Sequence, residues 1–237
     1  MWQFDTMVSE VVPRTQQISS FRFPIKSDGV VYSPGQFFFV TIKINGQNAI
    51  HHFSFSSSPT EKGYLEFTKR ITTHEFSQAL AALQPGDWAN LRGPMGNFTL
   101  PSQKHKLAFL SGGIGITPIR SMLRFLADSQ QTWDIVLLYG NSSYEEIAFR
   151  DELTELSAQN PGLRIEHVLS DPELPPGWQG RRGHINTDLI RLTIPDFGDR
   201  FFYLSGPPKM VTSLEDQLSA LEIPPEKIRR DSFTGYD

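Results

Sequence analysis

The chain has 237 residues, of which 38% are hydrophobic, with a formal net charge of −4 and no cysteine. This length accommodates two domains of ordinary size, and the apolar content is sufficient to build hydrophobic cores. The lack of cysteine excludes disulfides, catalytic thiolates and cysteine-ligated iron–sulfur clusters within the chain. The slightly acidic balance gives no reason to expect nucleic acid as a partner.

The sequence also bears on location and on metal binding. No apolar run approaches the ~20 residues that cross a bilayer, and the N-terminal stretch MWQFDTMVSE lacks a signal-peptide pattern. We therefore expect a cytoplasmic protein without a membrane span. The adjacent His51 and His52 direct their rings to opposite faces of a strand, and no histidine lies in a metal-ligand spacing. We expect no metal site, so that redox chemistry would require an organic cofactor.

Residues 1–102 predict short strands separated by turns. Residues 37–44 alternate, with Phe38, Val40, Ile42 and Ile44 on one side, and the turn residues Asn45-Gly46 follow. Similar segments, with a short helix at 77–83, lie at 3–12, 18–25, 50–56, 64–71 and 87–91. Many short strands at this spacing predict an antiparallel β-barrel.

Beyond residue 102 the pattern changes to apolar runs that alternate with amphipathic helices. Strands are expected at 107–110, 135–139, 163–169 and 201–204. The helix after the first of them has Ile119, Met122, Leu123 and Leu126 at helical spacing. Alternating strands and helices predict a doubly wound α/β fold with a parallel sheet. We therefore expect two domains, 1–102 and 103–237, and the second ends in a C-terminal tail.

Two glycine-containing loops follow predicted strands of the second domain. In residues 111–118 (SGGIGITP), Thr117 is a candidate N-cap and Pro118 a candidate first helical residue. Residues 205–210 (SGPPKM) again join a strand to a helix. Both loops would lie at the carboxyl ends of parallel strands, where ligands bind, and glycines let backbone N–H groups approach a pyrophosphate. The pair of loops predicts a dinucleotide site.

These loops and several barrel segments resemble, in the same order, the motifs of the ferredoxin–NADP reductase superfamily. The matching segments are 51–59 (HHFSFSSSP), 67–70 (FTKR), Ser77, 93–98 (GPMGNF), 112–118 (GGIGITP), 205–210 (SGPPKM) and 231–236 (DSFTGY). The resemblance covers nearly the whole chain. It implies a flavin-binding barrel followed by a nucleotide-binding α/β domain, with FAD as cofactor and NADH or NADPH as substrate.

The resemblance also implies roles for individual residues. Flavin would contact His51, Phe53, Ser54, Ser57, Thr68, Lys69 and Ser77, and the nucleotide Gly112, Gly113, Gly115, Thr117, Gly206, Pro207 and Met210. Hydride transfer requires the two rings to stack at about 3–3.5 Å. Ser54 would bond flavin N5, Ser205 would face the nicotinamide and Asp231 would lie near the reacting atoms. Phe233, or Tyr236, would gate access to the flavin.

Two departures from the family pattern leave alternatives open. His51 stands where relatives use a phosphate-binding arginine, and a neutral imidazole binds phosphate less well. The flavin is therefore either a tightly held FAD, which we favour, or a loosely bound flavin. No cation occurs in residues 140–143 (GNSS), where NADP-specific relatives often place arginine. This favours NADH. NADPH is the alternative, in which Arg181 or Arg182 would bind the 2′-phosphate.

The sequence thus supports three functional hypotheses. The first is an NAD(P)H-dependent flavin oxidoreductase that delivers electrons to a separate acceptor, either a small redox protein such as ferredoxin or flavodoxin or a small molecule. The second, motivated by His51, is a flavin reductase that uses free flavin as a substrate. The third is a non-catalytic nucleotide-binding regulatory module, motivated by the missing arginine, tyrosine and cysteine in the expected motifs.

Overall fold

A computed structural model of the chain describes residues 1–25 and 29–233. Its contacts divide the chain into two compact units, which are considered separately below. The first, the barrel unit, comprises Met1–Leu100 and Thr117–Phe125; the second, the α/β unit, comprises Pro101–Ile116 and Leu126–Asp237. Tyr236, predicted as a second candidate gate, lies outside the described residues.

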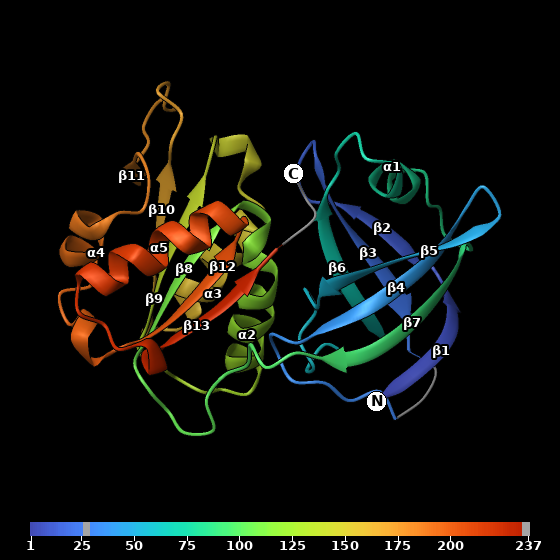
Figure 1. The fold of residues 1–237 in the computed structure, drawn as a ribbon, viewed down its shortest axis with the longest axis horizontal. Coiled ribbons are helices and arrows are strands. Elements are labelled where there is room, and N and C mark those ends of the chain that lie inside the picture. Colours follow the sequence, from blue (N-terminus) through green and yellow to red (C-terminus); the bar gives the residue numbers. More distant parts are fainter. Residues whose placement is uncertain (26–28, 234–237) are drawn as a thin grey trace. The chain divides into compact units, whose positions relative to one another are not determined.

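The barrel unit consists of antiparallel strands and one short helix (Figure 1). Its elements are β1 (Trp2–Met7), β2 (Glu10–Pro13), β3 (Ile18–Pro24), β4 (Phe37–Ile44), β5 (Gln47–Ser54), β6 (Tyr64–Arg70), α1 (Glu75–Ala81) and β7 (Trp88–Met95). They form a four-stranded sheet in the order β1-β7-β4-β5 and a three-stranded sheet in the order β2-β3-β6. All pairings are antiparallel, which confirms the predicted antiparallel architecture.

Aromatic side chains fill the interior of the barrel unit. The alternation predicted for β4 is observed, because Phe38, Val40 and Ile42 are fully buried. Phe38 stacks on Phe55 with 4.3 Å between ring centroids, and further stacked rings continue the core. Stacked pairs of this kind stabilise a core beyond the area that they bury. The apolar face of β4 therefore sets the inside of the barrel.

The α/β unit is built on a six-stranded parallel sheet. Its strands are β8 (Leu107–Gly112), β9 (Ile135–Asn141), β10 (Leu163–Leu169), β11 (Arg181–Arg182), β12 (Phe201–Gly206) and β13 (Ile228–Ser232), in the order β11-β10-β9-β8-β12-β13. Its longer helices are α3 (Arg150–Gln159), α4 (Thr187–Thr193) and α5 (Pro208–Ala220). Single 3-10 turns lie at Gly113–Gly115, Tyr144–Glu146, Phe197–Asp199 and Pro225–Lys227.

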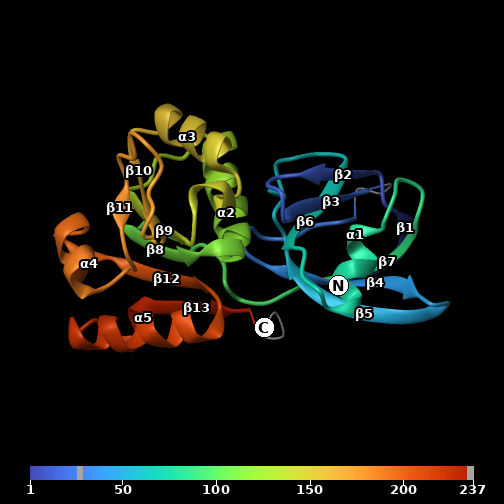
Figure 2. The ribbon, with the colours of Figure 1, turned by 90° about the horizontal axis from the view of Figure 1, so that it is seen from above.

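Helices cover both faces of this sheet, as predicted for a doubly wound fold. Figure 2 shows α4 and α5 on one face and α3 on the other. Side chains from β8, β9 and β12 form one apolar cluster with Ile190 and Ile194 of the α4 region and with Val211 and Leu214 of α5. All six residues of β8 are buried, because a central parallel strand is covered on both sides.

Helix α2 (Ile116–Asp128) begins two residues earlier than predicted and contributes to both units. The prediction that Thr117 caps it was wrong, since the 3-10 turn Gly113–Gly115 leads directly into a helix that starts at Ile116. Thr117 and Pro118 therefore lie inside the first turn. Proline is tolerated there because the N–H groups of the first turn have no intrahelical partner.

Several other elements differ from the predictions. The segment predicted as one strand at 3–12 forms β1 and β2, and β5 begins and ends earlier than 50–56. The sequence did not predict β11 or α4. Within the predicted C-terminal tail, Ile228–Ser232 forms strand β13, which pairs with β12. The carboxyl-terminal region is thus part of the sheet.

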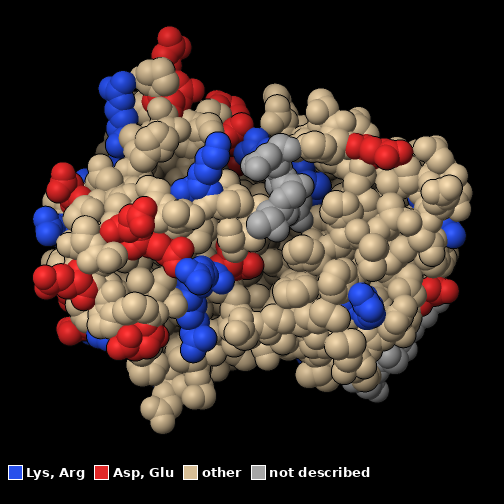
Figure 3. Space-filling model, viewed as in Figure 1, with Lys and Arg blue, Asp and Glu red and all other residues tan. Residues whose placement is uncertain are grey.

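Charged side chains are distributed differently over the two units on the face shown in Figure 3. Over the α/β unit, blue Lys and Arg side chains are interspersed with red Asp and Glu side chains. Over the barrel unit, most of the surface is tan and therefore uncharged. Among the described residues, no helix combines the length and apolar character needed to cross a bilayer.

Candidate functional site

The carboxyl end of β5 carries two of the predicted flavin residues. Ser54 is 9% exposed and Phe53 is 4% exposed. The Phe53 ring stacks on Phe67 with 4.2 Å between centroids and a 12° interplanar angle. Phe53 is therefore largely a core residue, while Ser54 lies where the core meets the surface. We call residues 54–58 the serine segment.

Residues 56–58 of the serine segment are fully buried and bonded to other parts of the barrel unit. The N–H groups of Ser56 and Ser57 both donate to the Glu66 carbonyl oxygen, at 2.8 and 3.3 Å. Ser57 Oγ accepts from the Glu66 N–H at 3.0 Å and lies 3.0 Å from the Tyr32 hydroxyl. The hydroxyl of Ser57, which the sequence predicted to bind flavin, is thus occupied by protein partners.

Two predicted cofactor hydroxyls are also used within the barrel unit. Thr68 Oγ1 donates to Ser56 Oγ at 2.8 Å, and Ser77 Oγ accepts from the Thr72 N–H at 2.7 Å. Both side chains are buried. What these residues retain for a cofactor is their backbone groups, their remaining lone pairs and the hydroxyl proton of Ser77.

A lysine and a histidine provide the basic groups of this region. Lys69 is 6% exposed, and burial lowers its pKa to about 8. Burial, followed by the positive charge of Lys69, lowers the pKa of His51 below 6.5, so the imidazole is neutral at neutral pH. The His51 ring lies 4.1 Å from the ring of Phe76 in α1. His51 thus lies beside α1, the helix that also carries Ser77, and Lys69 is near enough for its charge to act on the imidazole.

The two glycine loops of the α/β unit, predicted separately, contact each other. A Cβ added to Gly115 would lie 2.2 Å from the Ser205 carbonyl oxygen, and one added to Gly112 would lie 2.1 Å from Met210 Sδ. Gly206 has a φ of +153°, which L side chains rarely adopt, and its Cβ would lie 3.1 Å from the Gly112 carbonyl oxygen. Backbone atoms set the limit at Gly115 and Gly206, where glycine permits the close approach of the two loops, whereas at Gly112 the neighbour is the side chain of Met210.

A row of polar residues crosses the carboxyl end of the parallel sheet. Ser205 is in register with Ser111 on one side and with Asp231 on the other. From Ser111 the row continues through Tyr139 to His167. Residues in register on neighbouring strands point to the same face of a sheet. The structure therefore brings the predicted Ser205 and Asp231 together beside the glycine loops.

Several polar atoms in this region have no hydrogen-bond partner among the described residues. They are Ser111 Oγ, Ser205 Oγ, His167 Nδ1 and both side-chain heteroatoms of Asn141, all of them buried. Buried polar groups are normally paired with protein, water or ligand, so these atoms have bonding capacity that a ligand or water would use. Their mixture of donors and acceptors fits the hydroxyl and amide groups of a nicotinamide dinucleotide.

Ser111 and Asn141 were not predicted as site residues. Each lies at the end of a strand, next to a glycine, which is the only local signal that the sequence offers. Their relation to Ser205 depends on the strand order, because β8 lies between β12 and β9.

The predicted gate, Phe233, lies just beyond β13. Its N–H donates to the Gly206 carbonyl oxygen at 3.0 Å, which continues the β12–β13 pairing. The chain therefore runs along β12 as far as Phe233 and passes the second glycine loop.

The two arginines considered for a nucleotide phosphate have protein partners. Arg181 Nε donates to Glu166 Oε2 at 3.1 Å, and Arg182 Nη2 donates to the Pro172 carbonyl oxygen at 3.2 Å. Within the described part of the chain, no group of three or more histidine or acidic side chains could hold a metal ion.

Comparison with known proteins assigns a domain type to each half of the chain. Residues 5–112 match the oxidoreductase FAD-binding domain, and residues 109–216 match the oxidoreductase NAD-binding domain. The class that the fold and these matches define is an oxidoreductase with a flavin domain and a nicotinamide-nucleotide domain. The hydrogen-bonding and basic side chains described above fit FAD in the first domain and a nicotinamide nucleotide in the second.

Relatives of known name extend over most of the chain. NADH-cytochrome b5 reductase 1 of Aspergillus terreus is 30% identical over 86% of this chain and 72% of its own length. The reductase component of propane 2-monooxygenase from Rhodococcus jostii is 30% identical over 97% of this chain. The chain spans 63% of that relative, and 58% of the glycine betaine monooxygenase reductase subunit of Pseudomonas aeruginosa.

Solved structures share the fold. The FAD/NAD-binding domain of a nitric oxide dioxygenase from Vibrio cholerae superposes with a TM-score of 0.86 at 23% identity, covering 97% of this chain and 98% of that one. A ferredoxin NADP+ reductase from Neisseria gonorrhoeae gives 0.81 at 21% identity, covering 97% and 98%. The chain belongs to the ferredoxin–NADP reductase superfamily, which confirms the prediction from its motifs.

Proposed function

We propose that this chain is an FAD-dependent NAD(P)H oxidoreductase that takes hydride from a nicotinamide nucleotide and passes electrons to a separate acceptor. The observation that carries the proposal is that an FAD-binding and an NAD-binding domain model together cover residues 5–216. The unpartnered polar atoms at the carboxyl end of the sheet support the nucleotide half. When bound, FAD supplies the exchange between two-electron and one-electron chemistry.

The chain's own residues would bind and orient the reacting groups. Ser54 would donate its hydroxyl proton to flavin N5. Ser205 and its register partner Asp231 would border the nicotinamide, and Phe233 would gate access to the flavin. These assignments are supported by the partial exposure of Ser54 and by the pairing of Ser205 with Asp231.

Phosphate binding falls mainly to Lys69 on this proposal. A phosphate beside a partly desolvated ammonium group favours its charged form and raises its pKa. His51 contributes a neutral ring with a hydrogen-bond donor. The backbone of residues 112–117 and 206–207 would take the pyrophosphate of the nicotinamide nucleotide, because glycine lets backbone N–H groups approach a phosphate closely.

We further propose NADH rather than NADPH as the electron donor. The loop after β9 has no cation between Asn141 and Ser143, and Arg181 is paired with Glu166. A 2′-phosphate would need a positive charge, whereas a free ribose diol needs neutral donors and acceptors. The kcat/KM ratio for the two nucleotides measures the preference, and a higher value for NADPH would contradict it.

The acceptor is proposed to be a redox protein. Two of the relatives are named as the reductase parts of a propane and a glycine betaine monooxygenase. The Aspergillus relative is named as a cytochrome b5 reductase. Steady-state reduction of ferredoxin, flavodoxin, cytochrome b5 and free flavin in parallel identifies the class of acceptor. Exclusive reduction of free flavin would contradict a protein acceptor.

The central test of the function is anaerobic reduction. The purified protein should be yellow, should release FAD on denaturation, and should bleach on addition of NADH. A preparation that remains colourless after incubation with FAD, or whose bound FAD is not reduced by either nucleotide, would contradict the proposal.

A second function, the flavin reductase that uses free flavin, is favoured by one observation. The lowered pKa of His51 leaves its ring uncharged at neutral pH, which weakens phosphate binding. Equilibrium dialysis separates the two functions, because a prosthetic FAD stays with the protein at submicromolar concentration and a substrate flavin does not.

A further inference from the structure

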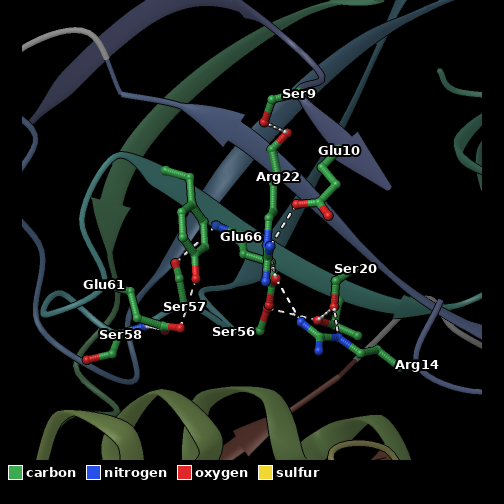
Figure 4. Close-up of polar contacts among 12 residues, drawn as sticks. Ser9, Glu10, Arg14, Ser20, Arg22, Ser56, Ser57, Ser58, Glu61 and Glu66 are labelled. Carbon is green, nitrogen blue, oxygen red and sulfur yellow. Dashed lines mark hydrogen bonds and ion pairs between the residues drawn. The ribbon is translucent and has the colours of Figure 1, made fainter. Parts of the chain in front are cut away.

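A closed ring of hydrogen bonds lies beneath the serine segment (Figure 4). Arg14 Nε donates to Ser20 Oγ at 2.7 Å, and Ser20 Oγ lies 2.7 Å from Thr68 Oγ1. Thr68 Oγ1 donates to Ser56 Oγ at 2.8 Å, and Ser56 Oγ donates to Glu66 Oε1 at 2.8 Å. Arg14 Nη2 closes the ring at Glu66 Oε2, at 2.9 Å. Its members come from β3, from β6, from Arg14 just after β2, and from the segment itself.

The carboxylate fixes the direction of every bond in the ring. A carboxylate only accepts, so the single hydroxyl proton of Ser56 must go to Glu66. Ser56 then accepts from Thr68, and Thr68 accepts from Ser20. Ser20 in turn accepts from Arg14, which only donates. The ring thus has one proton arrangement, and buried networks of this kind are strengthened by cooperativity when every member is satisfied.

Glu66 is the member with the most contacts to the segment. Its side chain is 1% exposed and also accepts from Arg22 Nε at 2.8 Å. Its backbone accepts from Ser56 and Ser57 and donates to Ser57 Oγ. One residue of β6 therefore holds two consecutive residues of the serine segment through both backbone and side chain.

The two carbonyl oxygens of the same stretch are also occupied. Arg120 Nη1 donates to the Ser56 carbonyl at 2.8 Å, and Ser121 Oγ donates to the Ser57 carbonyl at 2.6 Å. Each N–H, hydroxyl and carbonyl of Ser56 and Ser57 thus has a protein partner. All of these partners belong to the barrel unit, which therefore sets the shape of the segment.

We propose that Glu66 is a positioning residue for FAD, which acts through Ser56 and Ser57 to hold Ser54 ready for the flavin. It does not touch the cofactor. Its ring keeps the serine segment in the bound conformation, so that binding does not have to order it. The proposal rests on the proposed function, because it takes the serine segment as the flavin site.

Glu66→Gln tests the ring with almost no change of volume. If the glutamine N–H₂ group faces the arginines, donors meet donors. If it faces Ser56, the proton of Ser56 must go to Thr68, and the reversal continues until the Ser20 proton meets the Arg14 N–H. The first orientation leaves donor–donor contacts with both Arg14 and Arg22, and the second leaves one with Arg14, so the ring cannot close in either.

The measurement is FAD affinity and the visible circular dichroism of bound FAD, with apoprotein of the full chain. We expect Glu66→Gln to raise the Kd for FAD by about tenfold or more and to change the flavin dichroism. Ser20→Ala, which removes one hydroxyl distant from the segment, should cause a smaller change in the same direction. Glu166→Gln breaks an arginine–glutamate pair of the α/β unit and should leave both readouts unchanged.

The outcomes are distinct. Glu66→Gln and Ser20→Ala proteins that bind FAD within twofold of wild type, with the wild-type dichroism, would overturn the positioning role. Should Glu66→Gln lose its cooperative unfolding transition, Ser20→Ala decides alone. Failure of the wild-type chain to bind FAD at all would contradict the proposed function rather than the role of Glu66.

Discussion

At the scale of single residues, the proposed contact of His51 with a flavin phosphate predicts how FAD affinity changes with pH. The pKa of His51 is lowered by burial and by Lys69, so protonation adds a positive charge only as the pH falls below about 6.5. A flavin phosphate nearby favours the protonated ring, and FAD should therefore bind more tightly at pH 5.5 than at pH 7.5.

His51→Arg replaces this titrating ring with a permanent charge and a forked donor. We expect the Kd for FAD to fall by about tenfold at neutral pH, and its pH dependence below pH 7 to disappear. His52→Arg is the matched control, because the His52 ring lies against Phe37 and Phe39. Equal effects of the two substitutions would show that general charge, and not the place of His51, is responsible.

The absence of a side chain at Gly115 allows the first glycine loop to lie directly against the backbone of Ser205. Gly115→Ala would place a methyl group 2.2 Å from a backbone oxygen of Ser205, and backbone cannot move as a side chain does. We expect a loss of about 1–3 kcal/mol in the free energy of unfolding and a large rise in the KM for NADH. Gly198→Ala, where a Cβ meets nothing within 4 Å, should change neither quantity measurably.

At the scale of elements, the pair formed by Arg120 and Glu61 fastens the first turns of α2 within the barrel unit. The Arg120 side chain is 5% exposed and that of Glu61 14%. Burial alone would raise the pKa of Glu61, but the hydrogen bond and charge of Arg120 hold it below 4.5. The pair therefore stabilises the fold above about pH 4.5, and this contribution is lost as the pH falls through the lower pKa of the folded state.

Arg120→Met removes the partner and leaves Glu61 as an unpaired, largely buried carboxylate. We expect a loss of about 3 kcal/mol at neutral pH and a smaller loss at pH 3, where Glu61 is protonated in the variant. Urea unfolding at the two pH values measures the difference. Arg191→Met, an exposed position in α4, is the control, and a loss independent of pH would contradict the role of the charge.

The elements also show what the sequence could and could not predict. Strands β4 and β10 have the predicted bounds, and in β4 the apolar alternation is a strong local signal. Strand β13 (IRRDS) has no such signal, since it is an edge strand with three exposed residues of five; only its pairing with β12 makes it a strand. Thr117 was predicted as the N-cap of α2, but a 3-10 turn leads directly into the helix, so that Thr117 lies within its first turn.

The same distinction applies to the candidate site. The glycine loops could be identified from local motifs, because close backbone approach requires glycine. Ser111 and Asn141 could not, because their relation to Ser205 follows from strand order. The Glu66 ring joins residues that are far apart in the chain and chemically ordinary, so that only their geometry reveals it.

At the scale of the whole molecule, the two units should respond to different ligands. FAD should slow hydrogen exchange in residues 51–58 and 64–70, and NADH in residues 111–117 and 205–210. At one hundred times its Kd, each ligand that binds only the folded state adds about 2.7 kcal/mol to stability. Hydrogen-exchange mass spectrometry maps both effects. Protection by NADH that is confined to the barrel unit would contradict the assignment of the nucleotide site.

The contact between the two glycine loops has a consequence for how this chain can vary. The space beside Gly112 is filled by the sulfur of Met210, so a larger residue at one position requires a smaller one at the other. Alanine at 112 combined with alanine at 210 should therefore be accepted more readily than alanine at 112 alone. Among natural homologues the two positions should covary in size, although they lie on different loops and are distant in the sequence.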